Sequence, residues 1–469
     1  MVRIFSHYVH KKFMLLAGLE ALVLLFSFYL GLAFNLSGSA FADSGALTLV
    51  GSGASAMTAA LFVLGMVTVM KVLGLYDVVL WQNMRLVQVR MAIALPCSLA
   101  LIFLIVYAVP ALHFGTNGLI ITVSTAFGGI ALVRLLFYKW DKVGAFKPRV
   151  LVLGTGSRAV RLADIAQHSD KHFMVGYVPF PPSASHQVPA LQVLSIAAGE
   201  SLHSIVKKHR VNQIVIAVRD RRGALPVRDL LECRTQGVNV MELATFFERE
   251  YRQVALESIS PSWMMLGEGF RQGVLRRGMK RLFDLIVSAV LLLLALPIML
   301  IAAVCIVVES GFPVLYRQER VGQEGRVFSI YKFRSMNNNA ERDGTPRWAI
   351  ANDDRTTRVG RIIRKLRIDE LPQVINVFKG EMSFVGPRPE RSYFVDKLVN
   401  QIPYYALRHT VKPGITGWAQ VCYSYGASLD DTSEKLQYDL YYLKNHTLFL
   451  DLMILIATIE VVLWGKGAR

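Results

Sequence analysis

Two adjacent acidic residues, Asp369 and Glu370, are the side chains whose type and setting most favour chemistry in this sequence. Apolar residues at helical spacing follow them as far as Gly380, which predicts a helix that ends there. Pro372 is tolerated only in a first helical turn, so the acids are predicted to lie at the helix start, an end that attracts phosphate. Basic residues precede the pair: Arg361, Arg364, Lys365 and Arg367.

The acidic pair permits two interpretations. A carboxylate can attack phosphorus and hold the transferred group covalently, provided that the repulsion between two anions is removed. Arginines and a metal ion would remove that repulsion. Two acids at a helix N-terminus can also serve only as its cap. The pair alone therefore leaves catalysis and capping both open.

Three further motifs could assist such chemistry. Lys332 and Arg334 are spaced to face the same way on a predicted strand, although a solvated basic strand has the same pattern. Arg388 stands between Pro387 and Pro389, where a stiff backbone favours a phosphate grip. Lys412 opens a predicted tight turn that suits either a nucleotide or plain turn packing.

The composition indicates a membrane protein of two or three domains. The chain has 469 residues, of which 53% are hydrophobic, and a formal net charge of +18. That charge suits anionic lipid, phosphorylated substrates and nucleic acid equally. The four cysteines show no zinc or redox spacing and are interpreted as structural.

Four apolar runs open the chain and predict a transmembrane bundle over residues 1–140. They cover residues 13–34, 47–75, 91–112 and 119–137, each near the ~20 residues that a bilayer span needs. Lysines and arginines flank the ends of these runs so that both ends of the bundle are predicted to be cytoplasmic. The runs hold almost no internal charge, which disfavours a transport path.

Residues 148–262 predict a Rossmann-like α/β domain. A buried strand at Arg149–Leu153 runs into Gly154-Thr155-Gly156, and further strands at 173–178 and 213–218 alternate with helices at 195–210 and 226–236. No acidic residue closes the second strand to hold a ribose, because Pro179 stands there. A regulatory or scaffolding domain is favoured over a working NAD enzyme.

Residues 270–469 form the third predicted region, which begins with an apolar helix over 282–308. Basic residues flank both of its ends, and the positive-inside rule therefore predicts that both ends lie in the cytoplasm. Pro297 near the middle would bend the axis, so we expect a re-entrant helix, with an ordinary kinked span as the alternative. Residues 448–464 suit a helix that lies along the membrane interface.

The order of motifs in this region resembles the bacterial sugar transferase family of monotopic phosphoglycosyl transferases. The motifs are KFRSM, RIDELPQ, VGPRP, KPGITGWAQ and KLQYDLYY, which follow the apolar helix over Arg277–Arg469. With the preceding helices and α/β domain, the chain resembles the family's large form, the polyprenyl glycosylphosphotransferases. The resemblance implies a four-helix transmembrane bundle, a Rossmann-like α/β cytosolic domain and an α/β catalytic domain with a re-entrant helix and interfacial helices.

The resemblance implies a reaction in two halves. Asp369 would attack the β-phosphorus of a UDP-sugar and release UMP, and undecaprenyl phosphate would then take the sugar phosphate as the priming step of exopolysaccharide, capsule or O-antigen assembly. Asp369 and Glu370 would hold Mg²⁺, although Glu370 would instead assist entry of the acceptor in another interpretation. The residues assigned to substrate binding are Lys332, Arg334, Arg367, Pro387, Arg388, Glu390 and Lys412.

The resemblance also implies membrane lipid and a second copy of the chain as partners, no nucleic acid, and a multi-pass place in the bacterial inner membrane with both α/β domains cytoplasmic. One departure concerns Leu296-Pro297, where the family often has Ser-Pro, so that no serine hydroxyl braces the bend. A transporter or flippase and a nucleotide-sensing scaffold are the competing interpretations. The sugar is not predicted.

Overall fold

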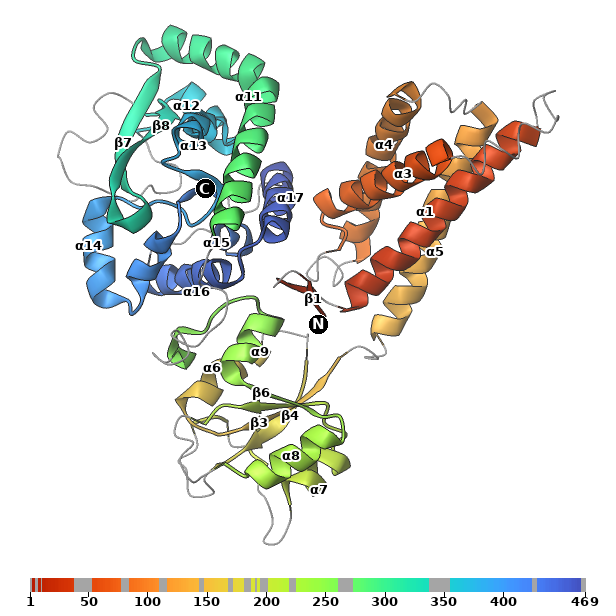
Figure 1. The fold of residues 1–469 in the computed structure, drawn as a ribbon, viewed down its shortest axis with the longest axis vertical. Coiled ribbons are helices and arrows are strands. Elements are labelled where there is room, and N and C mark those ends of the chain that lie inside the picture. Colours follow the sequence, from red (N-terminus) through yellow and green to blue (C-terminus); the bar gives the residue numbers. More distant parts are fainter. Residues whose placement is uncertain are drawn as a thin grey trace. The chain divides into compact units, whose positions relative to one another are not determined.

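The computed structural model describes residues 2–4, 7–9, 11–37, 53–76, 84–108, 116–142, 147–167, 172–180, 187–189, 192–194, 201–218, 225–259, 273–336, 355–423 and 428–464 (Figure 1). The chain divides into two compact units. The first unit contains residues 9–146 with the first two residues, and the second contains residues 3–8 and 147–469.

Long apolar helices make up the first unit. They are α1 (Lys11–Ser37), α3 (Gly53–Val72), α4 (Met84–Ala108) and α5 (Thr116–Lys142), and α1 packs along α5. In the described part of this unit, α1, α3 and α5 are long and apolar enough to cross a membrane. Large apolar side chains such as Leu22, Phe26 and Leu132 are exposed on these helices, as a lipid-facing surface requires.

The bundle, which is predicted to be almost free of internal charge, holds one buried acid–base pair. Glu20 of α1 and Arg134 of α5 are fully buried and form a two-bond pair, with Arg134 Nε 2.6 Å from Glu20 Oε1 and Nη2 3.2 Å from Oε2. Tyr76 donates its hydroxyl to Glu20, and Arg90 donates to the carbonyl of Leu73. The pair thus ties the turn after α3 to its neighbouring helices, because buried charge must be paired.

A parallel sheet forms the core of the α/β domain, residues 147–259 of the second unit. Its strands lie in the order β4 (Phe173–Val178), β3 (Arg149–Leu153), β5 (Gln213–Ile216), β6 (Asn239–Glu242). The helices that alternate with the strands are α6 (Ser157–Gln167), α7 (Leu202–Lys208), α8 (Val227–Thr235) and α9 (Leu243–Glu250), followed by η3 (Leu256–Ser258). The predicted strands are confirmed, with the third ending two residues early.

The first glycine after β3 has a packing role. Gly154 has φ +114°, and a Cβ there would lie 3.1 Å from the carbonyl carbon of Ala217. Glycine is therefore required by the close approach of the segment after β5. A glycine at this position does not by itself indicate a cofactor.

Helix α11 (Val274–Ser310) opens the C-terminal domain, residues 273–464, and is the fourth described helix long and apolar enough to cross a membrane. It bends within its length in Figure 1, and Pro297 stands inside it. Leucines, isoleucines and valines along it are exposed, among them Leu293, Ile301 and Val304. Asp284, near its start, is buried and accepts hydrogen bonds from the hydroxyl of Ser383 and the backbone N–H of Phe384.

Short elements follow α11 in the C-terminal domain. An antiparallel hairpin joins β7 (Leu315–Val321) to β8 (Val327–Phe333), with η4 (Gln323–Gly325) between them, and a small parallel pair joins β9 (Ser383–Val385) to β10 (Gly414–Thr416). The other elements are α12 (Arg358–Lys365), η5 (Ile368–Gln373), α13 (Val374–Lys379), α14 (Ser392–Gln401), η6 (Tyr405–Thr410), α15 (Trp418–Cys422), α16 (Leu429–Asn445) and α17 (Leu448–Trp464).

Helix α16 joins the two domains of the second unit. Arg161 of α6 contacts Glu434 and Gln437 of α16, each at 2.7 Å, and Lys444 contacts Glu248 of α9 at 2.6 Å. The short strands β1 (Val2–Ile4) and β2 (His7–Val9) pair at the N-terminus, where the imidazole of His7 lies 3.0 Å from the hydroxyl of Tyr441. Helix α16 is therefore anchored on several sides.

Candidate active site

The acidic pair lies in the first turn of η5, a 3-10 helix that continues into α13. The residue before η5, Arg367, takes a left-handed backbone with φ 58°. Gly380 ends α13 with φ 83°, as predicted. The sequence thus located both ends of the helical segment, but the first turn is tighter than the predicted α-helix. Pro372 lies inside that turn.

Asp369 and Glu370 are both buried, at 8% exposure, but their surroundings differ. One oxygen of Glu370, Oε1, accepts hydrogen bonds from Lys332 Nζ at 2.9 Å and Arg388 Nη2 at 2.7 Å. Asp369 makes no hydrogen bond or ion pair with the residues that the structure describes. Glu370 is therefore held by two cations, whereas the carboxylate of Asp369 has no described hydrogen-bond or ion-pair partner.

The two carboxyls also differ in pKa. Burial opposes the ionisation of Glu370, yet Arg388 and Lys332 hold its pKa well below the usual range. Burial, and then the negative charge of Glu370, raise the pKa of Asp369 to about 6, although Lys332 and Arg367 act against this. Burial likewise lowers the pKa of Lys332, an effect that Glu370 opposes. Glu370 is thus a fixed anion, whereas the pKa of Asp369 lies at about 6.

The loop that carries Arg388 packs tightly against the turn that begins at Lys412. A Cβ on Gly386 would lie 2.4 Å from the carbonyl oxygen of Lys412, and the N–H of Gly414 donates to the carbonyl of Pro387. Only a glycine permits so close an approach of two backbones. The structure therefore explains Gly386 and Pro387 as parts that fix the backbone of Arg388.

Three of the predicted substrate-binding residues do not contact the acidic pair. Arg334 caps the C-terminus of α11 by donating to the carbonyls of Ser310 and Gly311. Glu390 faces Arg320 at 3.6 Å. Lys412 lies at the far end of α13, where both it and Arg281 come within 4 Å of the place that a side chain on Gly380 would occupy.

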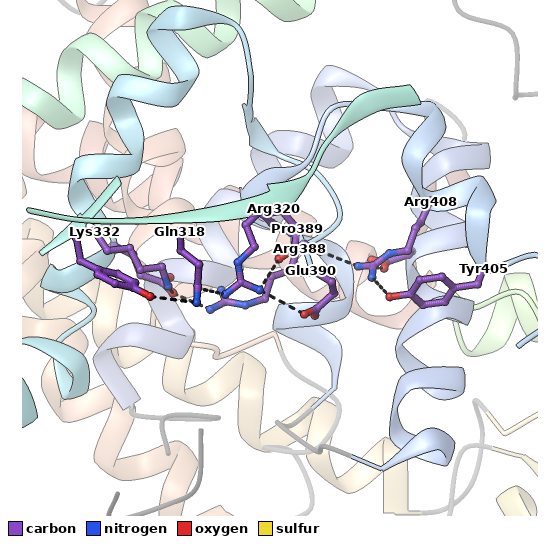
Figure 2. A network of polar contacts seen from close by, with 11 residues as sticks. Gln318, Arg320, Lys332, Arg388, Pro389, Glu390, Tyr405 and Arg408 are labelled. Atoms are coloured by element: carbon purple, nitrogen blue, oxygen red, sulfur yellow. Dashed lines mark hydrogen bonds and ion pairs between the residues drawn. The ribbon is translucent and has the colours of Figure 1, made fainter. Parts of the chain in front are cut away.

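The structure adds a group of buried and half-buried polar residues behind the Arg388 loop that the sequence analysis missed (Figure 2). Arg320 of β7, Tyr405 and Arg408 of η6, and Asp439 of α16 belong to it. Arg408 donates to the Tyr405 hydroxyl at 2.6 Å and lies 3.0 Å from the Asp439 carboxylate. The single sequence signal for this group was the aspartate inside the YDLYY motif.

The donor set of the acidic pair suits a hard divalent cation only in part. Within the described ranges, no group of three or more histidine, cysteine, aspartate or glutamate side chains could hold a metal ion. Both described contacts of Glu370 use Oε1, so that Oε2 and the Asp369 carboxylate are free of described hydrogen bonds. Two carboxylates with phosphate oxygens as further ligands form a common magnesium site.

The described helices that are long and apolar enough to cross a membrane suit a membrane-bound protein, and its C-terminal domain holds an acidic pair of which Glu370 is bonded by two cations. A model of the family "Bacterial sugar transferase" matches residues 275–465, which contain this site. An uncharacterized sugar transferase of Bacillus subtilis, EpsL, is 41% identical over 195 residues, which cover 41% of this chain and 90% of EpsL. The chain belongs to the bacterial sugar transferase family.

Longer relatives match over part of their length. A UDP-N-acetylgalactosamine-undecaprenyl-phosphate N-acetylgalactosaminephosphotransferase of Aeromonas hydrophila is 52% identical over 190 residues, which cover 40% of this chain and 45% of the relative. A UDP-glucose:undecaprenyl-phosphate glucose-1-phosphate transferase of Xanthomonas campestris is 35% identical over 312 residues, which cover 63% of this chain and 62% of the relative. The alignments thus span less than two thirds of these two proteins.

Proposed function

We propose that this chain transfers a sugar 1-phosphate from a UDP-sugar to undecaprenyl phosphate through a covalent phosphosugar on Asp369. The observation that carries the proposal is the contrast within the acidic pair: Glu370 is clamped by Lys332 and Arg388, whereas Asp369 is buried and has no described partner. A nucleophile must be free to move onto its target, and a clamped anion is not. The names of the Aeromonas and Xanthomonas relatives support the same reaction class.

The proposed reaction balances as two displacements at one phosphorus. A carboxylate oxygen of Asp369 attacks the β-phosphorus, and the bond from that phosphorus to the oxygen bridging the α-phosphate breaks, so that UMP leaves. An oxygen of undecaprenyl phosphate then attacks the phosphosugar, and the bond to Asp369 breaks and restores the carboxylate. Lys332 and Arg388 lower the repulsion between anions in both halves.

We propose that a magnesium ion binds at this site with ligands from both the protein and the substrate. One oxygen of Asp369 and the free oxygen of Glu370 would hold the ion, which would leave the second oxygen of Asp369 for the attack on phosphorus, and phosphate oxygens of the substrate would serve as further ligands. When bound, it would neutralise charge on the phosphates. Lys332 and Arg388 keep Glu370 ionised, which is the protonation state that a metal ligand requires.

The membrane supplies the proposed second substrate. The exposed apolar surface of α11, its bend (Figure 1) and the presence of Pro297 inside it support a re-entrant helix that enters and leaves on the cytoplasmic side. Helix α17 supports an interfacial placement, because its Asp451 is buried while Leu452, Ile459 and Leu463 are exposed. Both would hold the acidic pair near the lipid phosphate.

We further propose that the protein lies in the bacterial inner membrane with its α/β and C-terminal domains in the cytoplasm. We propose a homodimer and assign the α/β domain, the predicted Rossmann-like region, a supporting role. The product would prime assembly of an exopolysaccharide, capsule or O-antigen. The sugar that is transferred can be identified by measuring UMP release with a panel of donors that includes UDP-N-acetylgalactosamine, UDP-glucose and UDP-galactose.

Radiolabelled UDP-sugar, incubated with the purified full-length protein and Mg²⁺ but no lipid acceptor, tests the nucleophile. We expect the protein to carry sugar label with release of UMP, and Asp369→Asn to abolish both. Asp396→Asn is the matched control, because Asp396 is exposed on α14 and its carboxylate has no described contact. Addition of undecaprenyl phosphate should then move the label from protein to lipid.

The outcomes separate the competing functions. UMP release with lipid product but no labelled protein would reject the covalent step and keep the transferase. No UMP release with any UDP-sugar would leave the transporter or the nucleotide-sensing scaffold. The bundle gives transport little support, because its buried Glu20 and Arg134 are already paired with each other.

A further inference from the structure

Arg408 is a buried arginine, at 8% exposure, that points into the back of the Arg388 loop. Its Nη2 donates to the carbonyl of Arg388 at 2.8 Å and lies 3.0 Å from Asp439, and its Nη1 donates to the hydroxyl of Tyr405 at 2.6 Å (Figure 2). No described contact of Arg408 reaches Glu370 or Asp369. The described link from Arg408 toward the acidic pair is the carbonyl of Arg388.

Asp439 holds Arg408 in this position. The carboxylate is 2% exposed, and its described ion pair is with Arg408. Burial raises the pKa of Asp439 to about 6, against which Arg408 is the largest opposing influence. An arginine that is buried against a carboxylate and a hydroxyl has little freedom to leave its carbonyl partner.

The backbone of the Arg388 loop is hydrogen bonded at four successive carbonyls. Gly414 N–H donates to Pro387 at 2.9 Å, Arg408 to Arg388 at 2.8 Å, Arg320 to Pro389 at 3.4 Å, and Val321 N–H to Glu390 at 2.9 Å. Two of these four bonds come from arginine side chains. The two prolines also restrict the loop's own dihedral angles. The loop is thus held from three different elements while Arg388 extends to Glu370.

We propose that Arg408, held by Asp439, is a positioning residue that sets the guanidinium of Arg388 at the acidic pair. This inference rests on the proposed function, because it assigns Arg408 to the same phosphoryl transfer. The proposed role of Arg408 is to fix the position of the Arg388 guanidinium, and not to contribute its own charge at the phosphate. A shift of about 1 Å in a group that stabilises the transition state can cost about a hundredfold in rate.

A double-mutant cycle tests the proposal. Arg408→Lys keeps the charge beside Asp439, but a single ammonium cannot reproduce the planar fork that contacts Tyr405, Asp439 and Arg388 together. We expect kcat for UMP release to fall about tenfold or more, while KM for the UDP-sugar changes less than about threefold. In an Arg388→Ala background the same substitution should cost almost nothing more, because the group that it positions is gone.

Further variants keep the test informative. Tyr405→Phe removes one hydroxyl and should reduce kcat about two- to threefold, again only when Arg388 is present. Arg326→Lys, at an exposed arginine of the β7–β8 connection, should leave the rate unchanged. An equal loss from Arg408→Lys in both backgrounds, or no loss in either, would overturn the proposal.

Amide hydrogen exchange gives a readout that needs no turnover. Arg408→Lys should speed exchange at the amides of Gly414 and Val321, which donate to carbonyls of this loop, and leave the strands of the α/β domain unchanged. Unchanged exchange at these two amides would overturn the positioning role even if the rate fell. Wild-type protein that releases no UMP while the exchange effect is present would instead count against the proposed function alone.

Discussion

Arg388 Nη2 lies 2.7 Å from Glu370 Oε1, although the two residues are 18 positions apart in the chain. The contact crosses from the proline-flanked loop to the turn that carries the acidic pair. Lys332 reaches the same oxygen from β8, 38 positions before Glu370. This shared oxygen makes Glu370 a fixed anion and separates its role from that of Asp369.

Replacing Arg388 by alanine should damage the first half of the reaction most. The substitution removes one of the two cations at Glu370 and leaves less positive charge to meet the diphosphate. We expect kcat/KM for UMP release to fall about a hundredfold or more. Arg326→Ala on the exposed connection is the control, and a loss below about fivefold for Arg388→Ala would contradict the assignment.

The rate of protein labelling should depend on the ionisation of Asp369. Its pKa is about 6, and only the carboxylate can attack phosphorus, so the rate should fall as pH drops below about 6. Glu370→Gln removes a neighbouring negative charge that raises the pKa of Asp369. The acid limb of the pH–rate profile, where the rate falls with decreasing pH, should therefore move to lower pH. A limb that stays in place or moves upward in Glu370→Gln would show that another group titrates.

Removal of magnesium should stop labelling while the fold is retained. Chelation by EDTA removes the ion that the two carboxylates would share with the diphosphate, so UMP release should fall to background and return when Mg²⁺ is restored. Isothermal titration with Mg²⁺ and UDP-sugar should show binding that Glu370→Gln weakens. Full activity in EDTA would contradict a metal requirement.

If α11 is re-entrant, as we propose, both its ends face the cytoplasm. In a variant whose four native cysteines are replaced by serine, a single cysteine is introduced in place of Arg277 or of Arg326. Each should react with a membrane-impermeant maleimide only after the cells are opened. Both positions are exposed in the structure, so access to the reagent depends on the membrane alone. Labelling of one position in intact cells would make α11 an ordinary span.

The buried pair in the bundle should matter for stability more than for turnover. Glu20→Met leaves Arg134 buried without its carboxylate, and we expect a loss of about 3 kcal/mol or more in the stability of the first unit. Arg134→Met added to that variant should recover much of the loss, because two apolar side chains then face each other. Thermal unfolding in detergent measures both, and additive losses would show that the two residues do not act as a pair.

Local pattern was enough to predict several features of this protein. The apolar runs, the strands of the α/β domain, the helix end at Gly380 and the stiff setting of Arg388 all follow from residue type and spacing within a few turns of chain. Backbone conformation is decided largely at that range. The acidic pair could therefore be placed at a helix start before its surroundings were known, though not in a 3-10 turn.

Sequence by itself thus determined which residues had the right chemistry, and the tertiary structure decided which of them meet. Lys332 and Arg334 share a spacing and a charge, yet one clamps Glu370 and the other caps α11. Arg408 carries no motif, and Glu20 lay unnoticed in an apolar run, until packing brought each to a partner far along the chain. Contacts between distant elements depend on how those elements pack, and no local pattern contains that information.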